Sequence, residues 1–483
     1  MSELTFLSAV AMAEQVRRKQ VSPVELVEAH LAKIERLNPK VKAFIHVDAD
    51  RVRREAKAAE AAVSGRNTSS GVLGNVLGDV RGPLHGVPIS IKSSLEVAGL
   101  RCESGTRLRA GFVATQDAPL VARLKNAGAI VLGVTNTPEF LMAWETDNLL
   151  YGRTNSPWDL ERTPGGSSGG EAAAIAAGMS AGGVGSDGGG SIRVPAHFSG
   201  ICGLKPTPGR IPATGHYPAS AGPFALIGVV GPMARTVADL KLFFEVMQGP
   251  DDGDTSATPV PLRWPSDEEA KKLRVGYFED DGRTPVTPGT RAAVRTAAQA
   301  LQRAGFQVEP FTPAGLDEAR ELWRKFFVVA GGMMIRPMFQ DRERDLSPIL
   351  KQFLEWSAAG PPLTAETLLD AWVRRDTLRA QFLAQMRRYA ILLCPAAAIP
   401  AFRHGERSWQ IEGRTVNYLD AWSYTEWFNL LGNPAAVVPV GRSPEGLPIG
   451  VQIVGRPWEE EQVLTVAAAI EKECGAAKRP PIV

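Results

Sequence analysis

The sequence predicts an α/β protein in which a β-sheet carries helices on its faces, and two observations lead to this fold class. The first is a strand, a helix and a second strand in succession, expected at residues 87–91, 120–128 and 129–134. The second is the return of this order after a proline-rich connection, at residues 273–277, 290–304 and 306–310. Strands that alternate with helices in this way are typical of a sheet covered by helices.

The remaining elements follow from local signals. Ser22, Pro23 and Glu25 predict a helix start, because serine caps the helix, proline suits its first turn and the glutamate can close a capping box. Residues 63–80 are rich in Gly, Ser and Asn and predict a surface loop. We expect a mainly helical region over residues 317–386, then strands at 390–393, 436–440 and 449–454. Aromatic residues along the helical region could cover an active site, although core packing explains aromatic residues at helical spacing more often.

Composition excludes several classes of protein. The 54 Lys and Arg residues nearly balance 52 Asp and Glu residues over 483 positions, so the net charge is only +2 and nucleic acid is not an expected partner. The four cysteines lie far apart, which predicts free thiols and not a zinc site or a disulfide framework. No metal cluster, nucleotide fingerprint or cofactor-lysine motif is present, so we expect catalysis without a metal or cofactor. With no recognisable leader and no apolar run long enough to span a bilayer, we expect a cytoplasmic protein that does not bind membranes.

Two segments rich in glycine and serine stand out, at residues 163–171 and 185–193. A flexible linker is one interpretation of such a segment. However, an alanine-rich helix expected at 172–177 follows the first segment at once, and neither segment has the Gly-Lys-Ser or Gly-Lys-Thr ending of a P-loop. Backbone N–H groups from Gly188 to Ser191 could instead converge on one oxygen and form an oxyanion hole.

A serine nucleophile needs a neighbouring base. Of the six histidines, only His197 lies close in sequence to Ser191, and its apolar neighbours favour a structural histidine packed in the core. The other available base is Lys92, provided that burial makes its neutral form accessible near pH 7. From its own segment alone, a strand-end lysine that reaches solvent is the favoured interpretation of Lys92.

Taken together, these segments resemble the amidase signature family. The resemblance rests on motifs along most of the chain: Gly-Val-Pro-Ile-Ser-Ile-Lys at 86–92, Gly-Gly-Ser-Ser-Gly-Gly at 165–170, Asp-Gly-Gly-Gly-Ser-Ile-Arg at 187–193, Gly-Leu-Lys-Pro-Thr at 203–207, Gly-Asn-Pro-Ala at 432–435 and Leu-Pro-Ile-Gly-Val-Gln at 447–452. It implies the amidase signature fold, with a central mixed β-sheet covered by helices on both faces. One departure is Ser93-Ser94, where many members carry Asp-Asn after the lysine.

The resemblance also implies roles for individual residues. Ser191 is the expected nucleophile, Ser167 a bridging serine held by a cis peptide, and Lys92 the base. The expected oxyanion donors are the N–H groups of Gly188, Gly189, Gly190 and Ser191. The expected bracing residues of these loops are Ser168, Asp187 and Arg193, each of which could also be merely structural.

The implied reaction is hydrolysis of a C–N bond through a covalent acyl-enzyme. The chain resembles stand-alone, broad-specificity amidases, which makes amides, esters and carbamates candidate substrates and a urethanase activity compatible with the sequence. Leu141 and Met142 lie in a region that often contributes to the family's acyl pocket, and their apolar character favours an apolar or aromatic substrate. Two alternatives stay open: the A subunit of an aminoacyl-tRNA amidotransferase, and a non-catalytic binding protein on the same fold.

The absence of repeats and of a strong internal boundary predicts one amidase domain over residues 1–483, acting as a monomer or homodimer. Within it we expect an N-terminal helical segment over about 1–70, a signature core over 80–250 and a mainly helical substrate-side region over 315–390.

Overall fold

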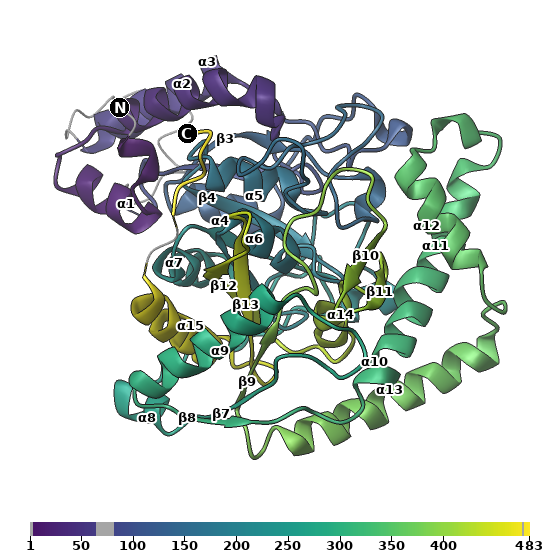
Figure 1. Ribbon diagram of the computed structural model, residues 1–483. Helices are drawn as coiled ribbons and strands as arrows, with labels where there is room; N and C mark the ends of the chain where they lie inside the picture. The colour runs from purple at the N-terminus through teal and green to yellow at the C-terminus, as the bar shows by residue number, and fades with distance from the viewer. Residues whose placement is uncertain (1–2, 64–81, 476–477) are drawn as a thin grey trace.

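The computed structural model describes residues 3–63, 82–475 and 478–483. Its centre is a mixed sheet of 11 strands, and the prediction of an α/β fold with a mixed sheet flanked by helices is confirmed (Figure 1). In sheet order the strands are β1 (Phe44–Val47), β3 (Ile130–Thr135), β2 (Pro88–Lys92), β4 (Gly182–Asp187), β6 (Val229–Ala234), β5 (Cys202–Lys205), β12 (Ala435–Arg442), β13 (Pro448–Val454), β9 (Ile391–Pro395), β7 (Arg274–Tyr277) and β8 (Gln307–Pro310). A separate hairpin pairs β10 (Ser408–Ile411) with β11 (Arg414–Asn417).

Strand pairing brings the segment that ends at Lys92 and the second Gly/Ser segment to the same end of two neighbouring strands. β2 runs parallel to both β3 and β4, with Lys92 opposite Thr135 and Ser90 opposite Gly183. The carboxyl ends of β2 and β4 therefore lie side by side. Lys92 ends β2, and the chain that leaves β4 at Asp187 is the second Gly/Ser segment.

The helices are α1 (Ala9–Arg17), α2 (Pro23–Val41), α3 (Ala49–Val63), α4 (Pro119–Asn126), α5 (Gly169–Ala176), α6 (Arg193–Ser199), α7 (Val237–Met247), α8 (Asp267–Lys271), α9 (Pro288–Arg303), α10 (Leu316–Trp323), α11 (Ala330–Ile335), α12 (Pro348–Ala358), α13 (Ala365–Gln385), α14 (Ser423–Leu430) and α15 (Glu460–Cys474). A π-helical segment, Arg324–Val329, joins α10 to α11. Figure 1 shows α10 to α13, in green, along one flank of the molecule. These helices correspond to the helical region that the sequence predicts over residues 317–386. No helix in the described part of the chain is long and apolar enough to cross a membrane.

The predicted capping box at the start of α2 is confirmed. The backbone N–H of Glu25 donates to Ser22 Oγ at 3.1 Å, and the N–H of Ser22 donates to Glu25 Oε2 at 2.8 Å. These bonds satisfy N–H groups that have no partner within the helix.

Alternate residues of β12 face opposite sides of the sheet. Ala436 and Val438 belong to the apolar cluster that includes α7, α9 and α15, whereas Val437 packs with residues of α5 and α6. This is the period of two that a strand covered on both faces requires. The sheet is therefore buried between two helical layers at this point.

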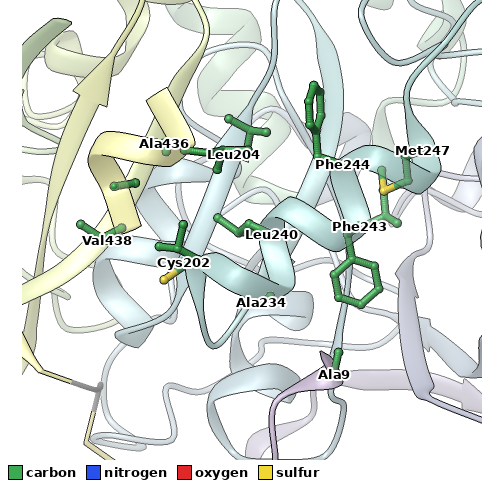
Figure 2. Close-up of a cluster of buried hydrophobic side chains, with 14 of the residues drawn as sticks. Ala9, Cys202, Leu204, Ala234, Leu240, Phe243, Phe244, Met247, Ala436 and Val438 are labelled. Carbon is green, nitrogen blue, oxygen red and sulfur yellow. The ribbon is translucent and has the colours of Figure 1, made fainter. Parts of the chain in front are cut away.

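Figure 2 shows part of the first of these clusters, to which α7 contributes several large side chains. Leu240, Phe243 and Phe244 of α7 are fully buried and belong to the same cluster as Leu204 of β5. Burial of each phenylalanine side chain contributes roughly 1.5–3 kcal/mol of stability. This packing holds β5 and β6 in place beside β4.

The strand β4 is missing from the sequence prediction, which treats residues 185–193 as a turn. Gly182, Gly183 and Gly185 remove the β-branched signal that would reveal a strand. The structure explains one of these glycines, because a Cβ at position 183 would lie 2.1 Å from Ser90 O and 2.1 Å from Glu171 Oε1. Close packing against β2 and α5 thus requires glycine at position 183, although glycine has a low strand propensity.

Three further predictions have different outcomes. The four cysteines are free thiols, as predicted. The surface loop predicted at 63–80 falls almost wholly on residues 64–81, which lie outside the described residues. The division into a single domain with three regions stays a prediction.

Candidate active site

The amine of Lys92 lies in a nest of serine hydroxyls at the end of β2. Its side chain is fully buried, and Nζ donates to Ser167 Oγ at 2.7 Å, to Ser168 Oγ at 3.0 Å and to Ser186 Oγ at 3.0 Å. A hydroxyl can donate as well as accept, so this nest can solvate a neutral amine as well as an ammonium. The structure thus places Lys92 inside the protein, against the interpretation of a lysine that reaches solvent.

Burial is the main influence on the protonation of Lys92. It lowers the pKa of the amine well below the ordinary value for lysine, because the charged form loses its hydration. The negative charges of Asp187 and Glu171 act in the opposite direction without overcoming this effect. The direction is the one that a lysine base needs near neutral pH.

The two carboxyl groups that influence Lys92 bond to other residues. Glu171 accepts hydrogen bonds from Ser90 Oγ at 2.5 Å and from Thr135 Oγ1 at 2.8 Å. Burial raises the pKa of Glu171 to about 7 despite these bonds and the nearby Lys92 charge. Among the described residues, neither Glu171 nor Asp187 forms a direct ion pair with Lys92.

Ser167 and Ser168 are held at the start of α5 by two contacts with other segments. Thr137 Oγ1 donates to the carbonyl oxygen of Ser167 at 2.8 Å, and the N–H of Ser168 donates to the carbonyl oxygen of Ser191 at 3.1 Å. The peptide bond from Gly166 to Ser167 is cis, as the resemblance implies. The two Gly/Ser segments are therefore in direct contact.

Ser191 lies between β4 and α6, with 8% of its surface exposed. It lines the same cavity as Ser167. Within the described part of the chain, Ser191 Oγ makes no hydrogen bond. The structure thus joins Lys92 to Ser167 directly and brings Ser191 to the cavity beside them, without a hydrogen bond from Ser191 to Ser167.

A buried ion pair braces the turn that carries Ser191. Arg193 donates to Asp187 through Nε at 3.0 Å and through Nη2 at 2.9 Å, and both side chains are fully buried. Burial alone would raise the pKa of Asp187, but the Arg193 guanidinium and the N–H of Ile192 hold it well below the usual range of a carboxyl group. Asp187 is therefore a fixed negative charge that is already paired.

The oxyanion donors expected at 188–191 divide into two groups. The N–H of Gly190 donates to Asp187 Oδ1 at 2.7 Å, so this group differs from the expectation of a free donor. The N–H groups of Gly188, Gly189 and Ser191 have no hydrogen-bond partner among the described residues. The backbone of Gly190 has φ at +111°, a conformation that favours glycine.

The cavity beside these serines has a volume of about 290 Å³ and mostly apolar walls. Leu141 and Met142 lie on its wall, and their role in an acyl pocket stays a prediction. The helical region also contributes to the walls, through Phe327, Met334, Ile335 and Met338. A cavity of this composition favours an uncharged, apolar ligand.

Comparison with known proteins shows the family. The family model described as Amidase matches residues 25–464. The protein belongs to the amidase signature family. It is 35% identical over 477 residues to an indoleacetamide hydrolase of Bradyrhizobium diazoefficiens, covering 97% of this chain and 86% of that protein. It is 33% identical over 506 residues to the A subunit of a glutamyl-tRNA(Gln) amidotransferase from Roseiflexus castenholzii, covering 98% of this chain and 96% of that protein.

A solved bacterial aryl acylamidase of the amidase signature family superposes with a TM-score of 0.84 at 26% identity. The match covers 97% of this chain and 96% of that one. The amidase fold of this protein is therefore shared along nearly its whole length.

His197 is a structural residue in this amidase fold, as its sequence neighbours indicate. It is fully buried, its Nδ1 accepts the N–H of Gly450 at 2.9 Å, and its Nε2 lies 3.0 Å from the carbonyl oxygen of Ile399. Burial lowers the pKa of this imidazole. Both ring nitrogens are satisfied by backbone groups, so His197 has no free nitrogen for Ser191.

Several residues of the site have no signal that identifies them in the sequence. Ser186 lies within the second Gly/Ser segment, yet its contact with Lys92 depends on the pairing of β4 with β2. His216 lines the cavity, and burial lowers its pKa to about 4. Its Nδ1 donates to the carbonyl oxygen of Pro218 at 2.7 Å, a bond that acts against the effect of burial without overcoming it.

The residues after Lys92 depart from the commonest family pattern without disturbing the amine. Ser93 and Ser94 are both buried, and their backbones bond to neighbouring strands and loops: the N–H of Ser93 donates to Thr135 O at 3.1 Å, and the N–H of Tyr217 donates to Ser94 O at 2.8 Å. Across residues 3–63, 82–475 and 478–483, no group of three or more His, Cys, Asp or Glu side chains could hold a metal ion.

Proposed function

We propose that this amidase family enzyme hydrolyses C–N bonds of small apolar amides through an acyl-enzyme on Ser191. Ser167 and Lys92 carry the protons. The observation that carries the proposal is the 2.7 Å contact between the buried amine of Lys92 and the hydroxyl of Ser167, beside the cavity that Ser191 lines. A buried amine that has hydroxyl neighbours, and no carboxylate partner among the described residues, is suited to accept a proton.

Acylation begins with two coupled proton transfers. Ser167 passes its hydroxyl proton to Lys92 Nζ and receives the proton of Ser191. Ser191 Oγ forms a bond to the carbonyl carbon, and the π electrons of the carbonyl move to its oxygen. The unpartnered N–H groups of Gly188, Gly189 and Ser191 are the donors available to that oxyanion.

The tetrahedral intermediate then loses the amine. The C–N bond breaks, and its electron pair takes a proton that returns from Lys92 through Ser167, so the leaving group departs as a neutral amine. A water molecule attacks the resulting ester of Ser191 while the same relay accepts its proton. The bond between Ser191 Oγ and the acyl carbon then breaks, and Ser191 Oγ regains its proton through the relay. This releases the carboxylic acid and restores the starting state.

The substrate proposal follows from the cavity walls. Leu141, Met142 and Phe327 offer apolar and aromatic contacts to the acyl group, so we propose uncharged aryl or alkyl amides as substrates. Esters and carbamates present the same carbonyl to Ser191, and we include them in the proposed range. The named activities of the indoleacetamide hydrolase and the aryl acylamidase support an apolar amide substrate.

The second candidate is the A subunit of an aminoacyl-tRNA amidotransferase, which the 33% identity to such a protein favours. That role would require partner subunits and ammonia transfer. Turnover of an aryl anilide by the purified chain alone decides for the stand-alone hydrolase. Labelling of Ser191 by a fluorophosphonate would likewise exclude a non-catalytic binding protein.

The direct test is Ser191→Ala, assayed against matched anilide, primary amide, ester and carbamate substrates. We expect a loss of about 10⁴-fold or more in kcat with normal folding by circular dichroism. Ser199→Ala is the matched control, because Ser199 is a buried serine at the other end of α6 and does not line the cavity. Near-normal turnover by S191A would end the assignment.

A further inference from the structure

The carbonyl groups of the turn that carries Ser191, residues 187–191, accept hydrogen bonds from side chains far away in the sequence. Trp323 Nε1 donates to the carbonyl oxygen of Gly188 at 2.9 Å. Trp144 Nε1 donates to the carbonyl oxygen of Gly189 at 2.8 Å, and Thr425 Oγ1 lies 3.0 Å from the same oxygen. Two indoles thus hold two successive peptide groups.

These two contacts differ in what they control. A trans peptide is planar, and its C=O and N–H point in opposite directions. The indole of Trp323 therefore sets the direction of the Gly189 N–H, which is one of the unpartnered oxyanion donors. The indole of Trp144 sets the direction of the Gly190 N–H, which already donates to Asp187.

The position of Trp323 is itself closely determined. It is the last residue of α10, it is fully buried, and its ring stacks on Phe327 at 4.8 Å with an interplanar angle of 14°. A Cβ at Gly189 would lie 2.4 Å from Trp323 Cζ2, so the indole packs directly on the turn. Since Phe327 lines the cavity, one aromatic stack connects the cavity wall to the oxyanion turn.

We infer that Trp323 is a positioning residue that orients the Gly189 N–H toward the oxyanion of the transition state. The inference rests on the proposed function, because it assigns a role within that mechanism. Among the described residues, no other side chain donates to the carbonyl of Gly188. Without the indole N–H, the 188–189 peptide loses this restraint and its N–H is less well preorganised.

The test compares three Trp→Phe variants of the full-length enzyme on one aryl anilide. We expect W323F to lower kcat about tenfold while KM stays within about twofold, because the lost interaction acts in the transition state. W144F should lose less, because Thr425 remains at the Gly189 carbonyl and the affected N–H is bonded to Asp187. W372F is the neutral control, since Trp372 lies in α13 and does not line the cavity.

Inhibitor binding separates positioning from general damage. A trifluoromethyl ketone that forms a hemiketal on Ser191 places an oxyanion at the turn, whereas the carboxylic acid product does not. W323F should raise the Ki of the ketone by the same factor that lowers kcat and leave the Ki of the acid unchanged. If W323F fails to fold, benzothienylalanine at position 323 keeps the shape of tryptophan without its N–H and must show the same pattern.

The outcomes distinguish this inference from the proposed function. If S191A turns over the anilide at the wild-type rate, the proposed function fails, and the inference fails with it. If S191A is inactive while W323F keeps wild-type kcat and ketone affinity, only the role of Trp323 is overturned. An equal loss in W372F, or an effect on KM alone, also overturns it.

Discussion

Replacement of Arg193 by methionine should destabilise this enzyme strongly and make its stability depend on pH in a new way. The substitution leaves Asp187 buried without its guanidinium partner. Loss of one member of a buried ion pair costs about 3–5 kcal/mol. Asp187 keeps the N–H donors of Gly190 and Ile192 and the amide of Asn429, so we expect the lower end, about 3 kcal/mol or roughly a 150-fold larger unfolding constant.

The sign of the pH dependence follows from the protonation of Asp187. In the wild type the folded-state pKa of Asp187 is lowered, so its contribution to stability is present above the unfolded pKa and lost only as pH falls through the folded value. In R193M, burial dominates and raises that pKa above the unfolded value. The folded variant is then favoured at low pH and loses this stability as pH rises through the folded pKa.

The assay is urea unfolding at pH 5 and at pH 8, followed by tryptophan fluorescence. The deficit of R193M relative to wild type should be larger at pH 8 than at pH 5. Arg283→Met is the control, because the pair of Arg283 with Asp317 leaves 57% and 68% of the side chains exposed and should contribute less than about 1 kcal/mol. A deficit in R193M no larger than that of R283M, or one that does not change with pH, would refute the reasoning.

Two other predictions concern the amine and the cavity. Because burial lowers the pKa of Lys92, kcat/KM should fall on the acid side as Lys92 takes up a proton. K92R, whose side chain is always charged, should be inactive with its folding intact. A K92R enzyme with a normal pH profile would contradict the role of a neutral amine. Ile335→Trp should fill part of the cavity, because Ile335 lies on its wall. It should lower kcat/KM for a phenylacetyl anilide about tenfold more than for an acetyl anilide. Equal effects on the two substrates would show that the acyl group lies elsewhere.

The parts of the fold that the sequence predicts correctly are those with a local pattern. The capping box at Ser22, the strand that ends at Lys92 and the helix after residues 165–170 each depend on neighbours within a few positions. The motifs around Ser167 and Ser191 likewise lie in continuous segments. Such elements are visible because their physical cause and their sequence signal occupy the same stretch of chain.

The parts that the sequence does not reveal depend on distant contacts. Arg193 bonds to Gln452 and Asn429, more than 230 positions away, and Trp323 reaches Gly188 across 135 positions. The loss of the Gly190 N–H from the oxyanion donors depends on backbone geometry within the turn. None of these contacts leaves a periodic pattern, so only the assembled sheet and its helical cover show them.

The surroundings of Lys92 favour the neutral amine that the proposed mechanism requires. Asp187 is the strongest nearby negative charge, but Arg193 neutralises it, and burial raises the pKa of Glu171 to about 7, so that carboxyl is only partly charged at neutral pH. Lys92 therefore gains little from becoming an ammonium and bears the full desolvation of that charge. Its three hydroxyl neighbours stabilise the neutral amine and give it a proton source in Ser167. A carboxylate placed directly against Lys92 would reverse this balance, which is why the separate pairing of Asp187 with Arg193 matters to the proposed chemistry as much as to the stability of the turn.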